Sequence, residues 1–192
     1  MVLVNYADRK VNCKIVYYGA EESGKTSNLI YIFNQLDETT RSNLITLESS
    51  AERTLFFDFM SLNLGEVKGF STTFSLYTVP GQIEYNDARK LILNGVDGLV
   101  FVADSDPNKR DSNIESYKNM LQNLSEYGLN FETIPIALQY NKRDLENVID
   151  LDKLEKDLNK EGFPSFEAVA TEGSGVFATL KAVSNLILTS LQ

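Results

Sequence analysis

The segment Gly19–Ser27, GAEESGKTS, decides how the rest of the sequence is interpreted. Through Thr26 it matches G-x-x-x-x-G-K-[ST], the pattern of a loop that wraps phosphates. Gly24 lets successive backbone N–H groups point inward at a helix N-terminus, where anions are favoured. Lys25 can then reach the β- and γ-phosphates, and the Thr26 hydroxyl can ligate Mg²⁺. We therefore expect a nucleotide to contact these residues: Gly19, Glu22, Ser23, Gly24, Lys25, Thr26 and Ser27.

The residues on either side predict the context that a phosphate loop requires. The apolar run Val11–Tyr18 is typical of a strand, and Thr26–Leu36 has the spacing of an amphipathic helix. The strand–loop–helix order disfavours the alternative, a simple glycine-rich turn before a capped helix.

Strand-like and helix-like segments alternate along the rest of the chain. Leu55–Leu64 and Phe70–Val79 flank a glycine-bearing turn and predict an antiparallel hairpin. Further strands are expected at Asp97–Asp104, Ile134–Tyr140 and Ser165–Thr171, and helices at Ser112–Gly128 and Val176–Leu191. This order predicts one α/β domain over residues 1–192, with a doubly wound, mainly parallel six-stranded-type sheet and one antiparallel hairpin strand.

Composition narrows the class of protein. The 192 residues are 43% hydrophobic and 23% charged, as in an ordinary globular domain, and the net charge of −9 argues against a nucleic-acid partner. The absence of histidine excludes His-based acid–base catalysis and most zinc sites. The single cysteine, Cys13, allows no intramolecular disulfide, which favours a reducing compartment. Without a signal peptide, a lipidation motif or a long apolar run, we expect a cytoplasmic protein with no membrane anchor of its own.

The tetrapeptide NKRD, Asn141–Asp144, predicts which base is bound. It follows the expected strand Ile134–Tyr140, and ligands bind at the carboxyl ends of strands in open α/β sheets. Guanine presents two donors, N1–H and the exocyclic amine, and one carboxylate, Asp144, can accept both. Adenine would place an acceptor against that carboxylate, which is costly. Asn141 can tie this loop to the phosphate loop, and the stem of Lys142 can cover one face of the base.

The segment VATEG, Val169–Gly173, follows the last expected strand. The backbone N–H of Ala170 can be offered to the guanine carbonyl oxygen, and Thr171 lies beside it. At this point the chain resembles the Ras-like small GTPases and, within them, the bacterial MglA-type polarity GTPases. The resemblance extends over essentially the whole chain, in VNYADRKVNCKIVYYG, ERTLFFDF, GEVKGF, LYTVPGQ, RKLILNGVDGLVFVADS, YNKRDL and EAVATEG.

The resemblance implies roles in hydrolysis. Thr54 matches the threonine that ligates Mg²⁺ and senses the γ-phosphate, and Arg53 matches an arginine that stabilises transition-state charge. Gly81 would offer its N–H to the γ-phosphate, and Gln82 would orient the attacking water. Gln82, Arg53 and Lys25 are thus the expected catalytic residues, with Thr26 and Thr54 as metal ligands. A solvated Arg53 and a merely polar Gln82 remain the alternatives.

Two positions depart from the usual pattern of small GTPases. Thr78 stands where most of them keep an aspartate in the outer Mg²⁺ shell, a departure that MglA-type proteins share. Glu21 and Glu22 place carboxylates in the phosphate loop, where members of the family usually keep glycine and an apolar residue. Two unit charges ~5 Å apart repel by about 3 kcal/mol at an effective dielectric of ~20. Three interpretations stay open for Glu21: it projects into solvent, it obstructs hydrolysis, or it weakens nucleotide binding.

The resemblance therefore implies a GTP/GDP switch that controls polarity or motility through effectors, with Mg²⁺ as cofactor and slow intrinsic hydrolysis. A roadblock-fold, MglB-type regulator and concentration at a cell pole are part of that expectation. The aromatic stripe Leu55–Phe59 is either core or partner surface. The alternative function is a pseudo-GTPase scaffold that recruits partners without a nucleotide cycle.

Overall fold

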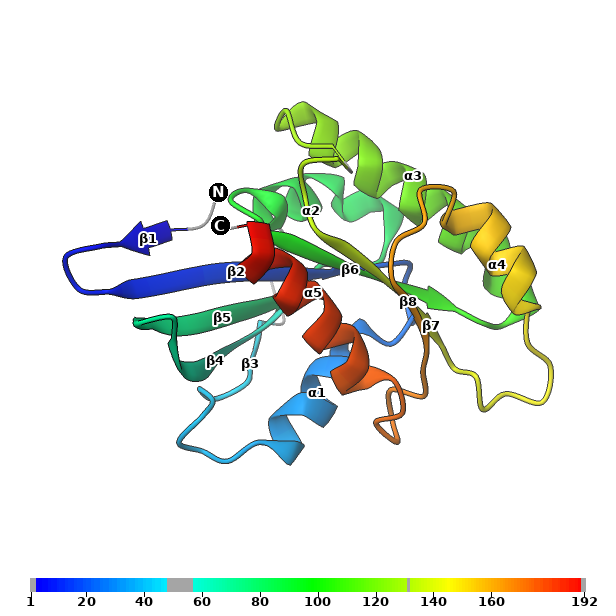
Figure 1. The fold of residues 1–192 in the computed structure, drawn as a ribbon. Coiled ribbons are helices and arrows are strands. Elements are labelled where there is room, and N and C mark those ends of the chain that lie inside the picture. Colours follow the sequence, from blue (N-terminus) through cyan, green and yellow to red (C-terminus); the bar gives the residue numbers. More distant parts are fainter. Residues whose placement is uncertain (1–2, 48–56, 131, 191–192) are drawn as a thin grey trace.

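A computed structural model describes residues 3–47, 57–130 and 132–190. Within these residues eight strands form one sheet, in the order β3-β4-β5-β2-β6-β7-β8, with β1 paired to β2 (Figure 1). The strands are β1 (Leu3–Asn5), β2 (Lys10–Tyr18), β3 (Ile45–Leu47), β4 (Phe57–Val67), β5 (Phe70–Thr78), β6 (Gly98–Asp104), β7 (Ile136–Asn141) and β8 (Ser165–Glu167). The helices are α1 (Lys25–Gln35), α2 (Asn86–Leu93), α3 (Arg110–Glu126), α4 (Leu151–Leu158) and α5 (Val176–Ser190), with 3₁₀ turns η1 (Ile83–Tyr85) and η2 (Pro107–Lys109).

The sheet has the expected class of topology. β2 pairs in parallel with β5 and β6, β6 with β7, and β7 with β8, whereas β4 pairs antiparallel with β5. The doubly wound, mainly parallel α/β fold with one hairpin is therefore confirmed. The sheet has two strands more than the six expected, because the three-residue strands β1 and β3 are too short to produce an alternating pattern.

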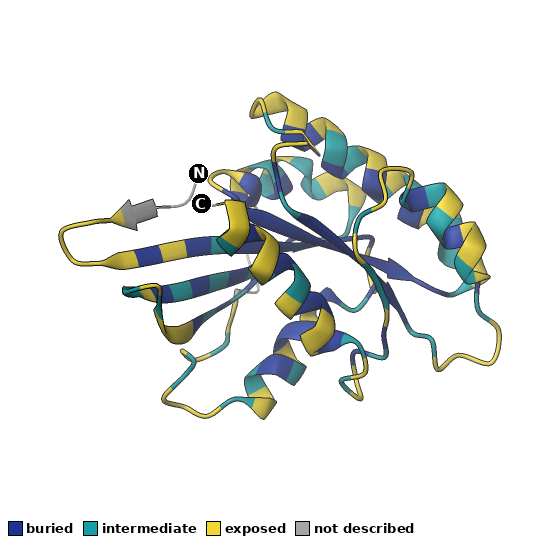
Figure 2. Ribbon diagram, in the orientation of Figure 1, coloured by how far each residue is buried: buried dark blue, intermediate teal, exposed yellow. Residues whose placement is uncertain are grey.

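The helices cover both faces of the sheet, and each face has its own apolar core (Figures 1 and 2). Alternate side chains of β2 enter opposite cores: Val16 belongs to the core that includes α3 and α4 residues, whereas Ile15 belongs to the core that includes α1 and α5 residues. All seven residues of β6 are buried, which explains why its sequence is continuously apolar rather than alternating.

The sequence analysis did not predict α2 or α4. Both helices have only eight residues, and α4, LDKLEKDL, buries only Leu154 and Leu158. Arg53 and Thr54 lie outside the described residues, as do Leu55 and Phe56 of the aromatic stripe and Leu191 of the expected C-terminal helix. Among the described residues, no helix combines the length and apolar character needed to cross a bilayer.

Helix α5 allows a direct test of the core that lies between the sheet and helices α1 and α5. Ile187 is fully buried, and its side chain lies where a Cβ on Gly98 of β6 would stand. Truncating Ile187→Ala should lower the free energy of unfolding by about 2–5 kcal/mol, because the deletion leaves a cavity under β6. Leu186→Ala, on the exposed side of the same helix, should cost less than about 1 kcal/mol. Urea unfolding of both variants measures the difference, and equal losses would contradict the packing described here.

Candidate nucleotide-binding site

The phosphate loop connects β2 to α1, and two of its glycines are required by close contacts. Gly19 has φ 147°, and a Cβ on it would lie 2.2 Å from the Val102 carbonyl oxygen. Gly24 has φ 101°, and a Cβ there would lie 2.0 Å from Nδ2 of Asn141. The loop therefore lies directly against the ends of β6 and β7.

Asn141 joins the phosphate loop to the two loops expected around the base. Its Nδ2 donates to the Ser23 carbonyl oxygen at 2.8 Å, and its Oδ1 accepts from the Ala170 N–H at 2.9 Å. Asn141 is almost completely buried, so these hydrogen bonds fix the relative positions of three segments that are far apart in the sequence. The Ala170 N–H, expected to be offered to guanine, donates to Asn141 instead, so a contact with the base requires that bond to be shared or replaced.

Lys25 is folded back into the phosphate loop. Its Nζ donates to the carbonyl oxygens of Gly19 and Ala20 at 2.9 and 2.6 Å. Burial lowers the pKa of Lys25 from 10.5 to about 8, because the charged form loses its hydration; Glu21 opposes this shift, whereas the charge of Arg89 adds to it. A phosphate group in this loop would supply the negative charge that the buried ammonium lacks.

The buried carboxylate of Asp58, on β4, accepts hydrogen bonds from three hydroxyl groups beside the phosphate loop. Thr26 and Thr78 donate to its Oδ2 at 2.6 and 2.9 Å, and Thr46 donates to its Oδ1 at 2.9 Å. Carboxylate and hydroxyl oxygens are ligands suited to Mg²⁺. Asp58 is 3% exposed and reaches this position because β4 and β5 place it beside Thr78, whose hydroxyl also accepts from the Asp58 N–H. No sequence motif pointed to Asp58.

Two of the cavities that border the phosphate loop are lined by the expected phosphate- and base-binding residues. The larger, about 340 Å³, is lined by Lys25, Thr26, Thr46, Asp58, Thr78 and Gly81, among others. The smaller, about 170 Å³, is lined by Glu22, Gly24, Ser27, Asn141, Lys142, Asp144, Leu145, Ala170 and Thr171. The first therefore brings together the expected phosphate and metal residues, and the second brings together the expected base-binding residues.

The base-side cavity is shaped by an ion pair. Lys142 has φ 64°, and its Nζ lies 2.7 Å from Oδ2 of Asp104, a carboxylate that is almost fully buried at the end of β6. This pair fixes the stem of Lys142 at the edge of the cavity, where the sequence analysis expected it to cover the base.

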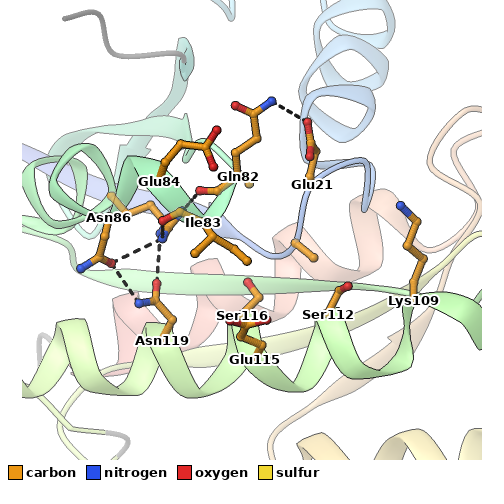
Figure 3. A pocket seen from close by; sticks show the side chains of 13 residues that line it. Glu21, Gln82, Ile83, Glu84, Asn86, Lys109, Ser112, Glu115, Ser116 and Asn119 are labelled. Atoms are coloured by element: carbon orange, nitrogen blue, oxygen red, sulfur yellow. Dashed lines mark hydrogen bonds between the residues drawn. The ribbon is translucent and has the colours of Figure 1, made fainter.

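The two glutamates of the phosphate loop do not project freely. Oε1 of Glu21 accepts a 2.7 Å hydrogen bond from Nε2 of Gln82 (Figure 3). Oε2 of Glu22 accepts a 3.0 Å bond from Nζ of Lys109. The bond from Lys109 lowers the pKa of Glu22, so this carboxyl is ionised at neutral pH. Glu22 has φ 62°, a left-handed conformation that glycine adopts at less cost. A Cβ on Gly81 would lie 2.4 Å from the Glu21 backbone, so the loop that follows β5 touches the phosphate loop directly.

Comparisons with known proteins agree with this geometry. Residues 14–162 match the family model described as the Gtr1/RagA G protein conserved region. The chain is 52% identical over 192 residues to the mutual gliding-motility protein MglA of Myxococcus xanthus, covering 100% of this chain and 98% of that protein. The chain belongs to the MglA-type small GTPases. It is also 29% identical over 143 residues to human ADP-ribosylation factor-like protein 4A, covering 74% of this chain and 64% of that protein.

Guanine-nucleotide binding and GTP hydrolysis are the activities of the small GTPase family. In this MglA-type chain, the residues expected to contact phosphate and base converge on one edge of the sheet, except for Arg53 and Thr54, which lie outside the described residues. Cys13 is buried on β2, away from this edge, and burial raises its pKa to about 12, consistent with a structural thiol.

The depressed pKa of Lys25 predicts a pH dependence of GDP binding. Phosphate requires the charged lysine, so above its pKa of about 8 binding must take up a proton. Fluorescence titration should show the affinity falling about threefold from about pH 7.5 to about pH 8.5. Without nucleotide, the free energy of unfolding should rise with pH between about 8 and 10.5, because the unfolded chain holds the extra proton there.

Lys25→Arg is the control, since arginine stays charged throughout this range. It should bind GDP more weakly than the native chain but without the fall in affinity. An equally steep fall in the arginine variant would assign the effect to another group.

Proposed function

We propose that this chain is a GTP/GDP switch that controls polarity or motility through effector binding and hydrolyses GTP slowly on its own. The observation that carries the proposal is the junction at Asn141, which holds the phosphate loop and the N-K-x-D loop against each other. A nucleotide can then contact both loops at once. The similarity to the Myxococcus gliding-motility protein supports the motility role.

In the proposed complex, the base occupies the 170 Å³ cavity. The carboxylate of Asp144 accepts from both guanine donors, while Lys142, Ala170 and Thr171 enclose the ring. The phosphates lie over the loop from Gly19 to Ser27, where backbone N–H groups and Lys25 meet their charge. Glu22 borders both cavities, and its bond to Lys109 holds the carboxylate outward.

We propose Mg²⁺ at the larger cavity, with Thr26 and Thr54 as direct ligands. Bound there, the ion would neutralise charge on the β- and γ-phosphates. Asp58 supplies the carboxylate that Thr78 lacks: its Oδ2 lies 2.6 Å from the Thr26 hydroxyl, close enough to accept from a metal-bound water. Its burial and its contacts with three hydroxyls hold it in position for that role.

For hydrolysis, we propose that Gln82 orients the attacking water, Gly81 contacts the γ-phosphate, and Lys25 and Arg53 stabilise the developing charge. The bond between Glu21 and Gln82 favours slow turnover, because it engages the glutamine amide that must reach the water. The same bond is the observation that favours the second candidate function, a pseudo-GTPase scaffold that recruits partners without a productive nucleotide cycle.

The partners proposed for this chain are based on its family membership and not on a contact seen in the structure. We propose a roadblock-fold, MglB-type regulator that positions the loops around the γ-phosphate, and effectors that recognise the same loops. We also propose that the protein acts in the cytoplasm as a single domain over residues 1–192, with any enrichment at a cell pole arising through these partners.

Exchanging the group that recognises the base tests the proposed function. Asp144→Asn replaces a double acceptor with an amide that can donate to the C2 carbonyl of xanthine. The variant should bind GDP about 100-fold more weakly and gain affinity for xanthosine diphosphate. Isothermal titration of GDP, ADP and xanthosine diphosphate gives the comparison.

Glu146→Gln is the matched control, because Glu146 is exposed two residues away and does not line the cavity. It should leave GDP binding unchanged. A native chain that binds ADP as well as GDP, or an Asp144→Asn variant with unaltered preference, would contradict the proposed guanine site.

A second prediction concerns turnover. Glu21→Gly should raise the single-turnover rate of GTP hydrolysis about tenfold, because it releases the Gln82 amide and removes a charge near the γ-phosphate. Glu21→Gln keeps an acceptor for Gln82 and removes only the charge, so its rate should lie between the two. Equal rates in all three proteins would show that Glu21 does not limit hydrolysis.

A further inference from the structure

Arg89 of α2 lies beneath the segment expected to respond to the γ-phosphate. Its side chain is buried, and its guanidinium donates to three carbonyl oxygens of that segment, those of Pro80 (3.3 Å), Gln82 and Ile83 (3.0 Å). Its Nε donates to Oδ1 of Asn119 at 3.0 Å. The hydrogen-bond acceptors of Arg89 within the described residues are all neutral oxygens, an unusual environment for a buried charge.

These bonds control the orientation of the loop because a peptide group is rigid. The Pro80 C=O and the Gly81 N–H belong to one planar trans peptide, so they point in opposite directions. Holding the carbonyl toward Arg89 therefore directs the Gly81 N–H away from α2. Gly81 itself touches the backbone of Glu21 and lines the 340 Å³ cavity together with Lys25 and Thr26.

A partly buried polar network anchors Arg89 to the rest of the fold. Asn119 of α3 accepts from Arg89 and also from the Tyr18 hydroxyl. Its Nδ2 donates to Asn86 at 2.9 Å (Figure 3). Asn123, one turn further along α3, donates to both Tyr18 and Asn86 at 3.0 Å. Tyr18 is fully buried and immediately precedes Gly19, so the network links the start of the phosphate loop to the 80–83 segment.

The space beside this segment explains why an anchor is needed. A cavity of about 490 Å³ opens between residues 81–86 and α3 (Figure 3). Arg89 forms part of its wall. Side chains therefore do not fill the region behind Gln82, and packing alone does not fix the loop. Directed hydrogen bonds from one buried guanidinium supply the constraint that packing does not.

We propose that Arg89 is a positioning residue that holds Pro80–Ile83 in the orientation needed to contact the γ-phosphate and to place Gln82. The inference rests on the proposed function, since it concerns the same nucleotide site. It assigns Arg89 a large effect on the response to the third phosphate and only a small one on the binding of GDP, because Arg89 lines neither the base-side cavity nor the cavity that contains Lys25 and Thr26.

The test separates these two effects in Arg89→Ala and Arg89→Lys. Arg89→Ala should keep its GDP affinity within about twofold but lose about tenfold both in single-turnover hydrolysis and in preference for a non-hydrolysable GTP analogue over GDP. Arg89→Lys, which keeps the charge but not the planar fork, should be intermediate. In NMR spectra, the change in the Gly81 amide signal between the GDP and GTP-analogue forms should shrink in the same order.

Lys90→Ala is the matched control: its side chain pairs with Glu126 on the surface of the same helix, and all readouts should equal those of the native chain. If Arg89→Ala does not fold, Asn119→Ala carries the test, since it removes the acceptor of Nε and should lower hydrolysis about threefold at unchanged GDP affinity.

Two outcomes would overturn the inference. Native hydrolysis and native GTP preference in the folded Arg89 or Asn119 variants would reject a positioning role while leaving the proposed function intact. A native chain that binds no guanine nucleotide would reject both.

Discussion

The parallel alignment of β2, β5, β6 and β7 is the constraint on which the candidate site depends. It places the carboxyl ends of these strands at one edge of the sheet, so the loops that follow them must meet there. The phosphate loop follows β2, the Gly81 segment follows β5, and the N-K-x-D loop follows β7. The contact between Gly24 and Asn141 shows how closely these loops meet, because any side chain at Gly24 would displace the asparagine that joins them.

The antiparallel hairpin contributes a different element, a carboxylate on the neighbouring strand. Thr78 ends β5 where many small GTPases carry an aspartate, and Asp58 of β4 lies beside it with its carboxylate on the Thr26 hydroxyl. The negative charge is thus kept near the proposed Mg²⁺ position although its place in the sequence has changed. Such a replacement is possible because cross-strand neighbours lie only about 4.5–5.5 Å apart at Cβ.

Local motifs were predictable, whereas partnerships between distant residues were not. GAEESGKT and NKRD each carry their chemistry within a few consecutive residues, and the apolar runs of β6 and β7 identify buried parallel strands. Asp58 escaped prediction because its role depends on the register of two strands, and Arg89 because its acceptors are backbone carbonyls in another segment. The contact between Glu21 and Gln82 joins residues 61 positions apart, and no sequence pattern specifies it.

Two features of the proposed site oppose each other: Asn141 joins the phosphate loop to the N-K-x-D loop, whereas Glu21 and Glu22 place two carboxylates in the phosphate loop. We propose that the chain binds guanine nucleotide despite these carboxylates, because Asn141, Lys25 and the hydroxyls around Asp58 are in position to hold it. The glutamates would instead lower the rate of GTP hydrolysis. The most direct test is mass spectrometry of the nucleotide released from the native protein purified in the presence of Mg²⁺. We expect GDP or GTP in near-stoichiometric amount. Protein that carries none, and takes up none when GDP is added, would show that the chain does not bind guanine nucleotide.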